Sequence, residues 1–421
     1  MVRLLYSLLV YLATPLVLVR LLWRARKQPE YLQNLDERWA LYRKPAAQKL
    51  IWVHAVSVGE TRAAQPLIEA LQNAWPEHRI LLTGMTPTGR EAGREVYGDR
   101  VVQAYLPYDY PGAVNRFFRH FSPVFGVLME TEIWPNLLAA AKRNDVPVIL
   151  ANARLSERSA RGYKKVRRLV QPAFMTLSAV AAQTTGDARR IDELGATHVS
   201  VCGNLKFDVT PAPEKLALGQ AWRKALGERQ VWLAASTREG EEVLVLDAWR
   251  KIDASPGQPP PLLVIVPRHP QRFAEVAELL ARNDVEFVRR STGMPAADTQ
   301  VWLGDSMGEM AAYYTLADIA FIGGSLLPLG GQNLIEAAAC GCPVVIGPHT
   351  LNFQRATEDA IAAGAAIRVD DPAGLAKAIS RAFAEVAEGS EMRNAAVRFA
   401  AAHRGATERT VALIRSVVTA G

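Results

Sequence analysis

The stretch from residue 323 to residue 343 (GGSLLPLGGQNLIEAAACGCP) combines features suited to binding a sugar nucleotide. An apolar run typical of a buried strand precedes it, and its glycines would let a ligand approach the backbone. The spacing predicts a helix over 333–339, whose first N–H groups would face an anion such as a phosphate. Glu336 lies one turn inside that helix, where a carboxylate can accept hydrogen bonds from both hydroxyls of a ribose. For the glycines alone, an ordinary tight connection in an α/β domain is an equally good interpretation.

A carboxylate follows the first predicted strand of the body, in the sequence HAVSVGETR, where Glu60 ends the group SVGE. A carboxylate within reach of an acceptor hydroxyl can take its proton as the oxygen attacks, which is general base catalysis. The competing interpretation is a helix cap that interacts with the helix dipole. Because Pro66 would cost about 3 kcal/mol deep inside a helix, the helix is expected to begin near Ala63 or to kink. Glu60 is then expected to be a loop residue.

Two further acids and a lysine lie at the ends of other predicted strands. Glu130 and Glu132 are two residues apart, so a regular strand would point both to one side. Paired acids beside a sugar also suit a glycosidase, but hydrolysis gives no reason for the ribose-type stretch. Lys206 is suited to stabilising a donor carboxylate or a departing phosphate, with a surface salt bridge as the alternative.

Polar residues also follow two predicted strands in the second half of the chain. Ser236 and Arg238 open a segment that resembles a helix start, with Ser236 or Thr237 as its cap. Arg268 is suited to binding a phosphate or a base. The neighbouring His269 is more readily a packed or hydrogen-bonding residue than a proton carrier.

Size and composition suit two domains in a reducing compartment. The chain has 421 residues, about half of them apolar, which is too long for one ordinary core. Its three cysteines argue against a disulfide framework, and no second cysteine pair completes four zinc ligands, so no metal is expected. The net charge of +7 suits an acidic membrane surface or substrate. No recognisable nucleic-acid module accompanies that charge, so no nucleic-acid partner is expected.

The amino terminus predicts a membrane anchor. Residues 4–19 carry no charge, and basic residues follow at Arg20, Arg24, Arg26 and Lys27. A full span needs about 20 apolar residues, so a tilted or interfacial helix is as plausible as a clean crossing. A signal peptide is the alternative, but no small-residue cleavage site follows. The positive residues after the segment would keep the rest of the chain on the cytoplasmic side.

From residue 50 onward, short apolar strands alternate with amphipathic helices, which is typical of parallel sheets covered on both faces. The predicted class is therefore α/β, and the proline-marked sequence TPAP at 210–213 divides the chain nearly in half. Strands are predicted at 51–56, 80–83, 101–105, 124–128, 148–150, 179–182 and 199–201, and at 231–234, 262–266, 285–288, 301–303, 319–322 and 343–346. The predicted organisation is an anchor at 1–27, a Rossmann-like domain at 28–209, a linker at 210–220, a second Rossmann-like domain at 221–394 and a terminal helix within 395–421.

Three further motifs resemble those of a known family. They are SVGE at 57–60, LMETEIWP at 128–135 and GNLKFD at 203–208. With the 323–343 stretch, they resemble bacterial 3-deoxy-D-manno-octulosonic acid (Kdo) transferases of lipopolysaccharide synthesis over nearly the whole chain. The resemblance implies a GT-B fold, with two Rossmann-like domains facing across a cleft and the last helix returning to the first domain. It also implies an inverting, metal-independent transfer of Kdo from CMP-Kdo to a lipid A precursor, with no cofactor.

The resemblance assigns roles to the residues found above. Glu60 matches the family's base, Glu130 belongs to the reaction centre and Lys206 assists there. Met307, Gly308 and Glu309 resemble the family's contact to the nucleotide base, with an ordinary helix entry as the alternative. Expected donor-binding residues are Arg268, His269, Met307, Gly308, Glu309, Asn333, Leu334, Ile335 and Glu336. Expected substrate contacts are Ser57, Gly59, Ser236, Arg238, Gly324 and Gln332.

The sequence therefore predicts a membrane-bound Kdo transferase on the cytoplasmic side of a bacterial inner membrane. Its expected partners are CMP-Kdo, the lipid A precursor lipid IVA, which would be modified on a glucosamine hydroxyl, and membrane lipids. One alternative is a sugar-nucleotide epimerase or hydrolase of the same fold, which would form product without a lipid acceptor. Another is a membrane-tethered binding protein on a transferase scaffold, although Glu60 beside the complete ribose-type stretch speaks against it.

Overall fold

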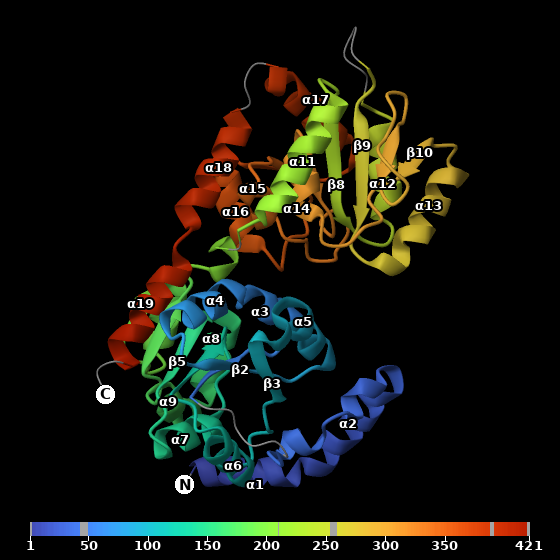
Figure 1. The fold of residues 1–421 in the computed structure, drawn as a ribbon. Helices are drawn as coiled ribbons and strands as arrows, with labels where there is room; N and C mark the ends of the chain where they lie inside the picture. The colour runs from blue at the N-terminus through green and yellow to red at the C-terminus, as the bar shows by residue number, and fades with distance from the viewer. Residues whose placement is uncertain (1, 43–48, 209, 253–258, 388–390, 419–421) are drawn as a thin grey trace. The chain divides into compact units, whose positions relative to one another are not determined.

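The computed structural model describes residues 2–42, 49–208, 210–252, 259–387 and 391–418 (Figure 1). The chain divides into two compact units. Unit 1 comprises Met1–Val209 with Arg404–Gly421, and unit 2 comprises Thr210–His403. Each unit contains a seven-stranded sheet in which every recorded strand pair is parallel. The predicted α/β class with two parallel-sheet domains is confirmed.

The sheet of unit 1 has the order β3-β2-β1-β4-β5-β6-β7. Its strands are β1 (Leu50–His54), β2 (Arg79–Gly84), β3 (Val101–Tyr105), β4 (Phe125–Met129), β5 (Val148–Ala153), β6 (Ala179–Ala182) and β7 (Val199–Val201). Its helices are α1 (Val2–Leu12), α2 (Thr14–Lys27), α3 (Val58–Ala63), α4 (Gln65–Ala74), α5 (Pro87–Tyr97), α6 (Pro111–Phe121), α7 (Pro135–Arg143), α8 (Glu157–Lys165), α9 (Arg167–Phe174), α10 (Thr185–Asp192) and α19 (Ala406–Val418). Short 3-10 helices are η1 (Pro29–Leu32), η2 (Asp36–Trp39), η3 (Gly98–Arg100) and η4 (Leu205–Asp208).

The strands of unit 1 are apolar on both sides because both faces of the sheet are covered. All five residues of β1 are buried. Trp52 packs into one core cluster with Phe117 of α6, and Val53 packs into the other cluster with Leu67 of α4. The sheet thus forms a rigid middle layer that fixes where its carboxyl ends lie.

The sheet of unit 2 has the order β10-β11-β9-β8-β12-β13-β14. Its strands are β8 (Val231–Thr237), β9 (Leu262–Pro267), β10 (Phe287–Arg289), β11 (Val301–Leu303), β12 (Ile319–Ile322), β13 (Val344–Ile346) and β14 (Ala366–Arg368). Its helices are α11 (Pro213–Leu226), α12 (Glu241–Trp249), α13 (Phe273–Arg282), α14 (Met310–Leu316), α15 (Ile335–Ala339), α16 (Gln354–Ala362), α17 (Pro372–Ala387) and α18 (Glu391–His403), with the 3-10 helix η5 (Pro270–Arg272).

Three details of the prediction are wrong. Most of the expected linker at 210–220 is the start of α11, where Gly219 packs so closely on α14 that a Cβ would lie 2.4 Å from the Ala312 carbonyl oxygen. In place of the single terminal helix expected within 395–421, the structure has two helices, because the chain breaks after α18 and restarts as α19. The edge strand β14 was not predicted, since three residues carry too little pattern.

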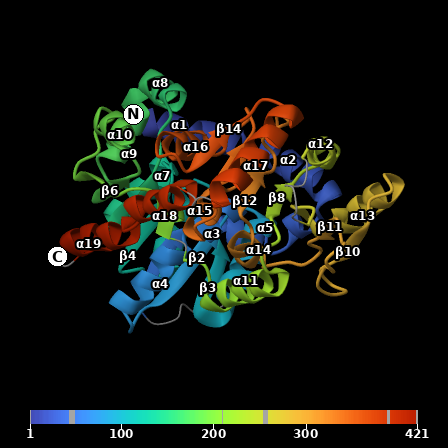
Figure 2. The same cartoon turned by 90° about the horizontal axis from the view of Figure 1, so that it is seen from above.

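The last helix belongs to unit 1, where α19 lies beside α4 in both views (Figure 1, Figure 2). Asp208 in η4 accepts hydrogen bonds from the backbone N–H groups of Gly405 (2.7 Å) and Thr407 (2.5 Å). These are orphan donors at the start of α19, so Asp208 caps a helix almost 200 positions away. Ala406 and Ile414 then complete the core cluster that contains Val53 and Leu67.

Candidate functional site

In both units, the candidate residues follow the strands at which the direction of winding reverses. In unit 1, the chain adds strands toward one edge of the sheet after β1 and toward the opposite edge after β4, and these two strands are neighbours. In unit 2, the corresponding neighbours are β8 and β12. Ligands of open α/β sheets bind outside the carboxyl ends of such strands. Glu60 follows β1 and Glu130 follows β4, while Arg238 follows β8 and Gly324 follows β12.

Glu60 lies in the first turn of the short helix α3, not in a loop as the sequence predicted. The reasoning about Pro66 was otherwise correct, since α3 ends at Ala63 and Pro66 stands in the first turn of α4. Ser57 is the N-cap of α3 and accepts a hydrogen bond from the Glu60 N–H (3.3 Å). The Glu60 carboxylate accepts in return from the Ser57 hydroxyl (2.9 Å) and from the Val56 N–H (2.8 Å). The capping interpretation is therefore correct, and it fixes the carboxylate in place.

The Glu60 carboxyl group is the most perturbed acid of this region. Burial raises its pKa to about 7; the Val56 N–H bond opposes that shift, while the negative charges of Glu130 and Glu132 add to it. A carboxyl group with a pKa near the working pH is well matched to accepting and releasing a proton.

Glu130 and Glu132 are brought toward Glu60 by an unusual backbone. Glu130 has φ of 60°, the left-handed region, which is uncommon for a residue other than glycine and often found at functional sites. The alternation of a regular strand therefore does not extend to these acids. Glu132 accepts a hydrogen bond from the indole N–H of Trp134 (2.7 Å). Burial raises the pKa of Glu132, the Trp134 bond opposes this, and the Glu130 charge adds to it.

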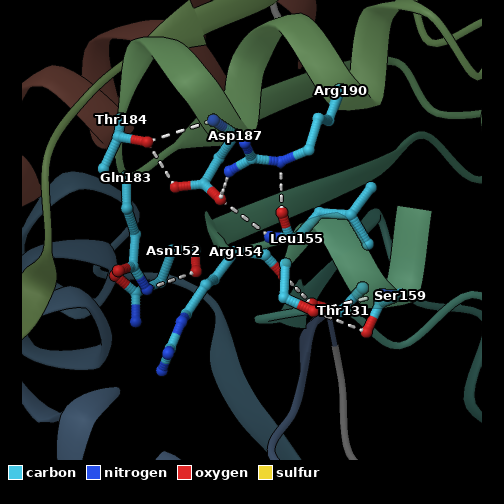
Figure 3. Close-up of polar contacts among 10 residues, drawn as sticks. Thr131, Asn152, Arg154, Leu155, Ser159, Gln183, Thr184, Asp187 and Arg190 are labelled. Carbon is cyan, nitrogen blue, oxygen red and sulfur yellow. Dashed lines mark hydrogen bonds and ion pairs between the residues drawn. The ribbon is translucent and has the colours of Figure 1, made fainter. Parts of the chain in front are cut away.

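A buried amide, Asn152, supports the same strand ends (Figure 3). It also has a left-handed backbone, with φ of 53°, and is almost fully buried. Its carbonyl oxygen accepts from the Gln183 amide (3.0 Å), and its side-chain oxygen accepts from the Leu205 N–H (3.1 Å). Sequence reasoning missed Asn152, although an amide at the end of an otherwise apolar strand was the available signal. Asn152 ties the end of β5 to the segment that carries Lys206.

Arg154 is held nearby on a clamped backbone. Its carbonyl oxygen accepts a hydrogen bond from the Thr131 hydroxyl, and the next residue, Leu155, donates its N–H to Asp187 (2.9 Å). Asp187 also pairs with Arg190 (2.9 Å). The exposed Arg154 side chain points away from the Asp187–Arg190 pair (Figure 3).

In unit 2, arginines gather at the ends of β8 and β9. The pKa of His269 is lowered, first by burial and then by the positive charges of Arg238, Arg268 and Arg272. His269 is exposed and not packed, and whether it carries protons stays untested. Arg272 is bound by Glu242 and Glu275. A positive region results, suited to a phosphate or carboxylate.

The charges of Arg268, which follows β9, and of Glu336, in the first turn of α15, both act on the buried phenol of Tyr314. The pKa of Tyr314 is raised mainly by burial, then by the Glu336 carboxylate, while the Arg268 charge lowers it. Glu336 stands in the first turn of α15, which begins at Ile335 and not at residue 333 as predicted. The Asn333 side-chain oxygen accepts from the Ile335 N–H (3.0 Å). Arg268 and Glu336, both expected to bind the nucleotide, therefore lie in one region of unit 2.

The glycine-rich stretch is built differently from the prediction. The N–H groups of Gly324 and Ser325 point at the buried carboxylate of Glu241 (2.5 and 3.0 Å), so the protein itself supplies the anion. A Cβ on Gly323 would lie 2.4 Å from the Ser236 carbonyl oxygen, so this glycine is required for the contact between two loops. Ser236 has φ of 56° and Thr237 ends β8; the N-cap of α12 is Gly240, so neither residue is the cap that was predicted.

The remaining candidates lie at the edges of this region. Met307 is exposed and Gly308 has φ of 74°. Glu309 accepts from the Arg290 guanidinium (3.2 Å) and from the Ser306 hydroxyl (2.5 Å). These contacts are those of a helix entry, the alternative interpretation, and a role in binding a nucleotide base stays a prediction. Leu334 is buried, and Gln332 donates its N–H to the Gly323 carbonyl oxygen (2.9 Å).

The amino-terminal helices are attached to unit 1 by polar contacts. The Tyr6 hydroxyl donates to Asp109 (3.0 Å) and the Ser7 hydroxyl donates to Asn136 (3.1 Å). The opposite side exposes large apolar side chains, among them Leu4 and Leu16, which are 72% and 73% exposed. Among the described residues, no single helix is long and apolar enough to cross a membrane. Helices α1 and α2, which are bent by 47° relative to each other, are long and apolar enough when taken together.

Across the described ranges, His, Cys, Asp and Glu side chains form no group of three or more that could hold a metal ion. The three cysteines are free thiols. A metal-independent reaction stays a prediction.

Comparison with known proteins decides the family. Residues 33–209 match the family described as 3-Deoxy-D-manno-octulosonic-acid transferase (kdotransferase). The chain is 46% identical over 370 residues to the 3-deoxy-D-manno-octulosonic acid transferase of Bordetella pertussis, covering 86% of each chain. It is 37% identical over 426 residues to the protein of the same name from Haemophilus influenzae, covering 98% of each chain. The chain belongs to the Kdo transferase family. The resemblance seen in the sequence is confirmed, and the enzyme is a Kdo-transferring glycosyltransferase.

Two solved structures share the fold of this Kdo transferase. A glycosyltransferase from Rickettsia africae has a TM-score of 0.58 at 13% identity and covers 90% of this chain and 99% of its own. The UDP-GlcNAc 2-epimerase of Neisseria meningitidis has a TM-score of 0.58 at 15% identity and covers 88% of this chain and all of its own. At such identities the likeness shows the fold alone, which is of the GT-B type.

One family motif of the transferase is mainly structural. In GNLKFD at 203–208, Leu205 is buried against Asn152, and Asp208 caps α19. The Asn204 side chain accepts from the Lys206 N–H (3.0 Å). These contacts hold the backbone of Lys206, and its part in the reaction stays a prediction.

Proposed function

We propose that this enzyme transfers Kdo from CMP-Kdo to a glucosamine hydroxyl of the lipid A precursor lipid IVA, with Glu60 as the base. The acceptor hydroxyl gives its proton to Glu60 as its oxygen attacks the anomeric carbon of Kdo. The bond from that carbon to the phosphate oxygen breaks, and CMP leaves with the electron pair. Attack opposite to the departing group inverts the anomeric configuration.

The observation that carries the proposal is the fixed, partly buried Glu60 carboxylate in α3, the helix that follows β1. Two hydrogen bonds orient it, and its pKa of about 7 lets it hold a proton during transfer and release it afterwards. Glu130 lies close enough for its charge to act on Glu60, which supports a place for Glu130 in the reaction centre. Lys206 is proposed to stabilise negative charge on the donor.

The donor is proposed to bind in unit 2. The charges of Arg238 and Arg268 both act on His269, which supports a site for the phosphate or the Kdo carboxylate. Glu336 is proposed to accept hydrogen bonds from the ribose hydroxyls, and Asn333 to contact the nucleotide beside it. The shared environment of Arg268 and Glu336 around Tyr314 supports this assignment.

The acceptor lipid is proposed to reach Glu60 along the amino-terminal helices. A cavity of about 320 Å³ lies between Tyr6, Val10 and Val17 on one side and Ile133 and Trp134 on the other. Val10, Val17 and Ile133 make part of its wall apolar, as an acyl chain requires, whereas Asp109 and the tyrosines at 6, 108 and 110 add polar groups. Trp134 is hydrogen-bonded to Glu132. A chain bound there would place the head of the lipid toward the three acids.

We also propose that α1 and α2 bind the cytoplasmic face of the inner membrane. The exposed leucines would enter the bilayer while the contacts of Tyr6 and Ser7 keep α1 on the protein. A groove of about 570 Å³ runs between α1 and the basic residues Lys165 and Arg168, which are suited to acidic lipid headgroups.

The reaction is tested by incubating the purified enzyme with CMP-Kdo and the lipid A precursor and weighing the lipid by mass spectrometry. A mass increase of one or more Kdo units is expected for the wild type and none for Glu60→Gln, which should still bind CMP. Release of free Kdo without a lipid product would favour a hydrolase. Binding of both substrates without any product would favour a non-catalytic protein.

A further inference from the structure

Glu241 is a buried carboxylate for which the transfer reaction has no direct use. It is the first residue of α12 and is 0% exposed. One carboxylate oxygen accepts from the N–H groups of Arg238 (3.0 Å) and Gly324 (2.5 Å). The other accepts from the N–H groups of Ser325 (3.0 Å) and Leu326 (3.2 Å). Burial of a carboxylate is costly unless its oxygens are satisfied in this way, so the four N–H groups and the carboxylate depend on one another.

These bonds join two loops across the reversal point of the sheet. Arg238 belongs to the connection after β8, and Gly324 to Leu326 belong to the connection after β12. In this fold class, that crevice is where ligands bind. The glycine-rich loop is therefore held by Glu241, a carboxylate of the protein itself.

Backbone hydrogen bonds connect the glycine-rich loop to the residues expected to bind the nucleotide. The carbonyl oxygens of Gly324 and Gly323 accept from the N–H groups of Gly331 (2.6 Å) and Gln332 (2.9 Å). Those two residues lead directly into the segment that carries Asn333 and Glu336. Three short steps thus connect the Glu241 carboxylate to the ribose-binding segment.

Ser325 ties the same loop to β13. Its hydroxyl oxygen accepts from the Gly347 N–H (2.8 Å), and its carbonyl oxygen accepts from the His349 N–H (3.0 Å). Ser325 is fully buried. The start of the loop is therefore bound to Glu241 and to the segment after β13, and its end is bound through Gly331 and Gln332.

The next residue, Glu242, holds the loops that follow β8 and β9. It is almost fully buried and binds the Arg272 guanidinium with both oxygens (2.6 and 3.0 Å) and the Thr237 hydroxyl (2.7 Å). The Thr237 carbonyl oxygen accepts from the Arg268 N–H (3.0 Å). The first turn of α12 therefore holds the arginine-bearing loops as well as the glycine-rich loop.

We propose that Glu241 is a positioning residue for the donor nucleotide, acting through the glycine-rich loop on Asn333 and Glu336. This role rests on the proposed binding of CMP-Kdo in unit 2. A glutamine at this position keeps the shape of the side chain but turns one acceptor oxygen into an N–H donor that faces backbone N–H groups. The loop then loses two of its four bonds, and the ribose-binding segment is no longer held in one place.

The test compares Glu241→Gln with wild type and with Glu239→Gln, an exposed residue in the turn just before α12. Calorimetry with CMP should give a dissociation constant about tenfold or more higher for Glu241→Gln, the equivalent of one lost charge-assisted hydrogen bond. The KM for CMP-Kdo should rise similarly while the KM for the lipid acceptor stays within about twofold. Glu239→Gln should match wild type.

A folded Glu241→Gln variant with a lowered melting temperature but wild-type affinity for CMP would overturn the proposal, because the residue would then be structural only. If that variant does not fold, Ser325→Ala loosens the same loop at its other tie and must weaken CMP binding in the same way; unchanged binding there would overturn the proposal too. A wild-type enzyme that does not bind CMP would instead remove the proposed donor, on which this role rests.

Discussion

Glu60 should make the folded protein less stable as the pH rises, and Glu60→Gln should remove that penalty. The folded pKa of about 7 lies above the ordinary value of 4.5. Below pH 4.5 the residue is protonated in both the folded and the unfolded chain. Between the two values, the unfolded chain ionises first, so the free energy of unfolding falls as pH rises. Above pH 7 both states are ionised and the loss is constant.

The size of the effect follows from the shift. A difference of 2.5 pKa units corresponds to roughly 3 kcal/mol, of which about 2.5 kcal/mol develops between pH 5 and pH 8. This is an upper value, because Glu60 keeps some contact with solvent. Glutamine cannot ionise, but it accepts only one of the two bonds from Val56 and Ser57, which costs about 1 kcal/mol. Glu60→Gln should therefore be slightly less stable than wild type at pH 5 and about 1 to 2 kcal/mol more stable at pH 8.

The assay is denaturant unfolding of both proteins at pH 5, 6, 7 and 8, followed as the difference in unfolding free energy. Titrating groups that do not interact with Glu60, such as Asp109, contribute equally to both proteins and cancel in that difference. The activity of wild type, measured as kcat/KM, should rise over the same range with a midpoint near pH 7, since only ionised Glu60 can accept a proton. A stability difference that does not depend on pH, or that favours wild type increasingly at high pH, would refute the reasoning.

Three further predictions concern single contacts. Glu336→Ala should raise the dissociation constant for CMP about tenfold by calorimetry, since one charge-assisted bond to the ribose is lost, and an unchanged constant would contradict the ribose assignment. Tyr6→Phe should lower the unfolding free energy by about 1 kcal/mol and expose α1 to limited proteolysis; equal cleavage rates would show that the Asp109 bond does not hold the helix. Asp208→Ala should cost about 1 to 2 kcal/mol in denaturant unfolding because two N–H groups at the start of α19 lose their acceptor, and no change would mean that water replaces the cap.

The sequence predicted the elements whose signal is local. The runs 101–105 and 319–322 became β3 and β12 with the same bounds. All four residues of β12 are apolar and buried because both faces of the sheet are covered there, whereas the edge strand β3 includes the partly exposed Gln103. The position of Pro66 correctly marked a helix boundary. Strand β14 was missed since three residues carry too little pattern.

The sequence predicted which residue types form the candidate site, but not the hydrogen bonds that connect them. Glu60 and Glu336 stand out because each acid follows a strand and opens a helix. The contacts of Asn152 and Glu241 join segments about 50 and 80 positions apart, and a single sequence carries no record of such distances. The glycines of the 323–343 stretch were interpreted as facing a ligand, whereas the structure uses Gly323 and Gly324 for contacts within the protein.

The return of α19 to unit 1 determines how the enzyme can be taken apart. Unit 2 is one continuous piece of chain, so a fragment of residues 210–403 would contain the whole unit without an engineered join. A fragment ending at residue 209 would lack Ala406 and Ile414 and leave an apolar hole beside Leu67. An isolated first half therefore has to carry residues 404–421 through an engineered join, either appended to its carboxyl end or supplied as a complementing peptide.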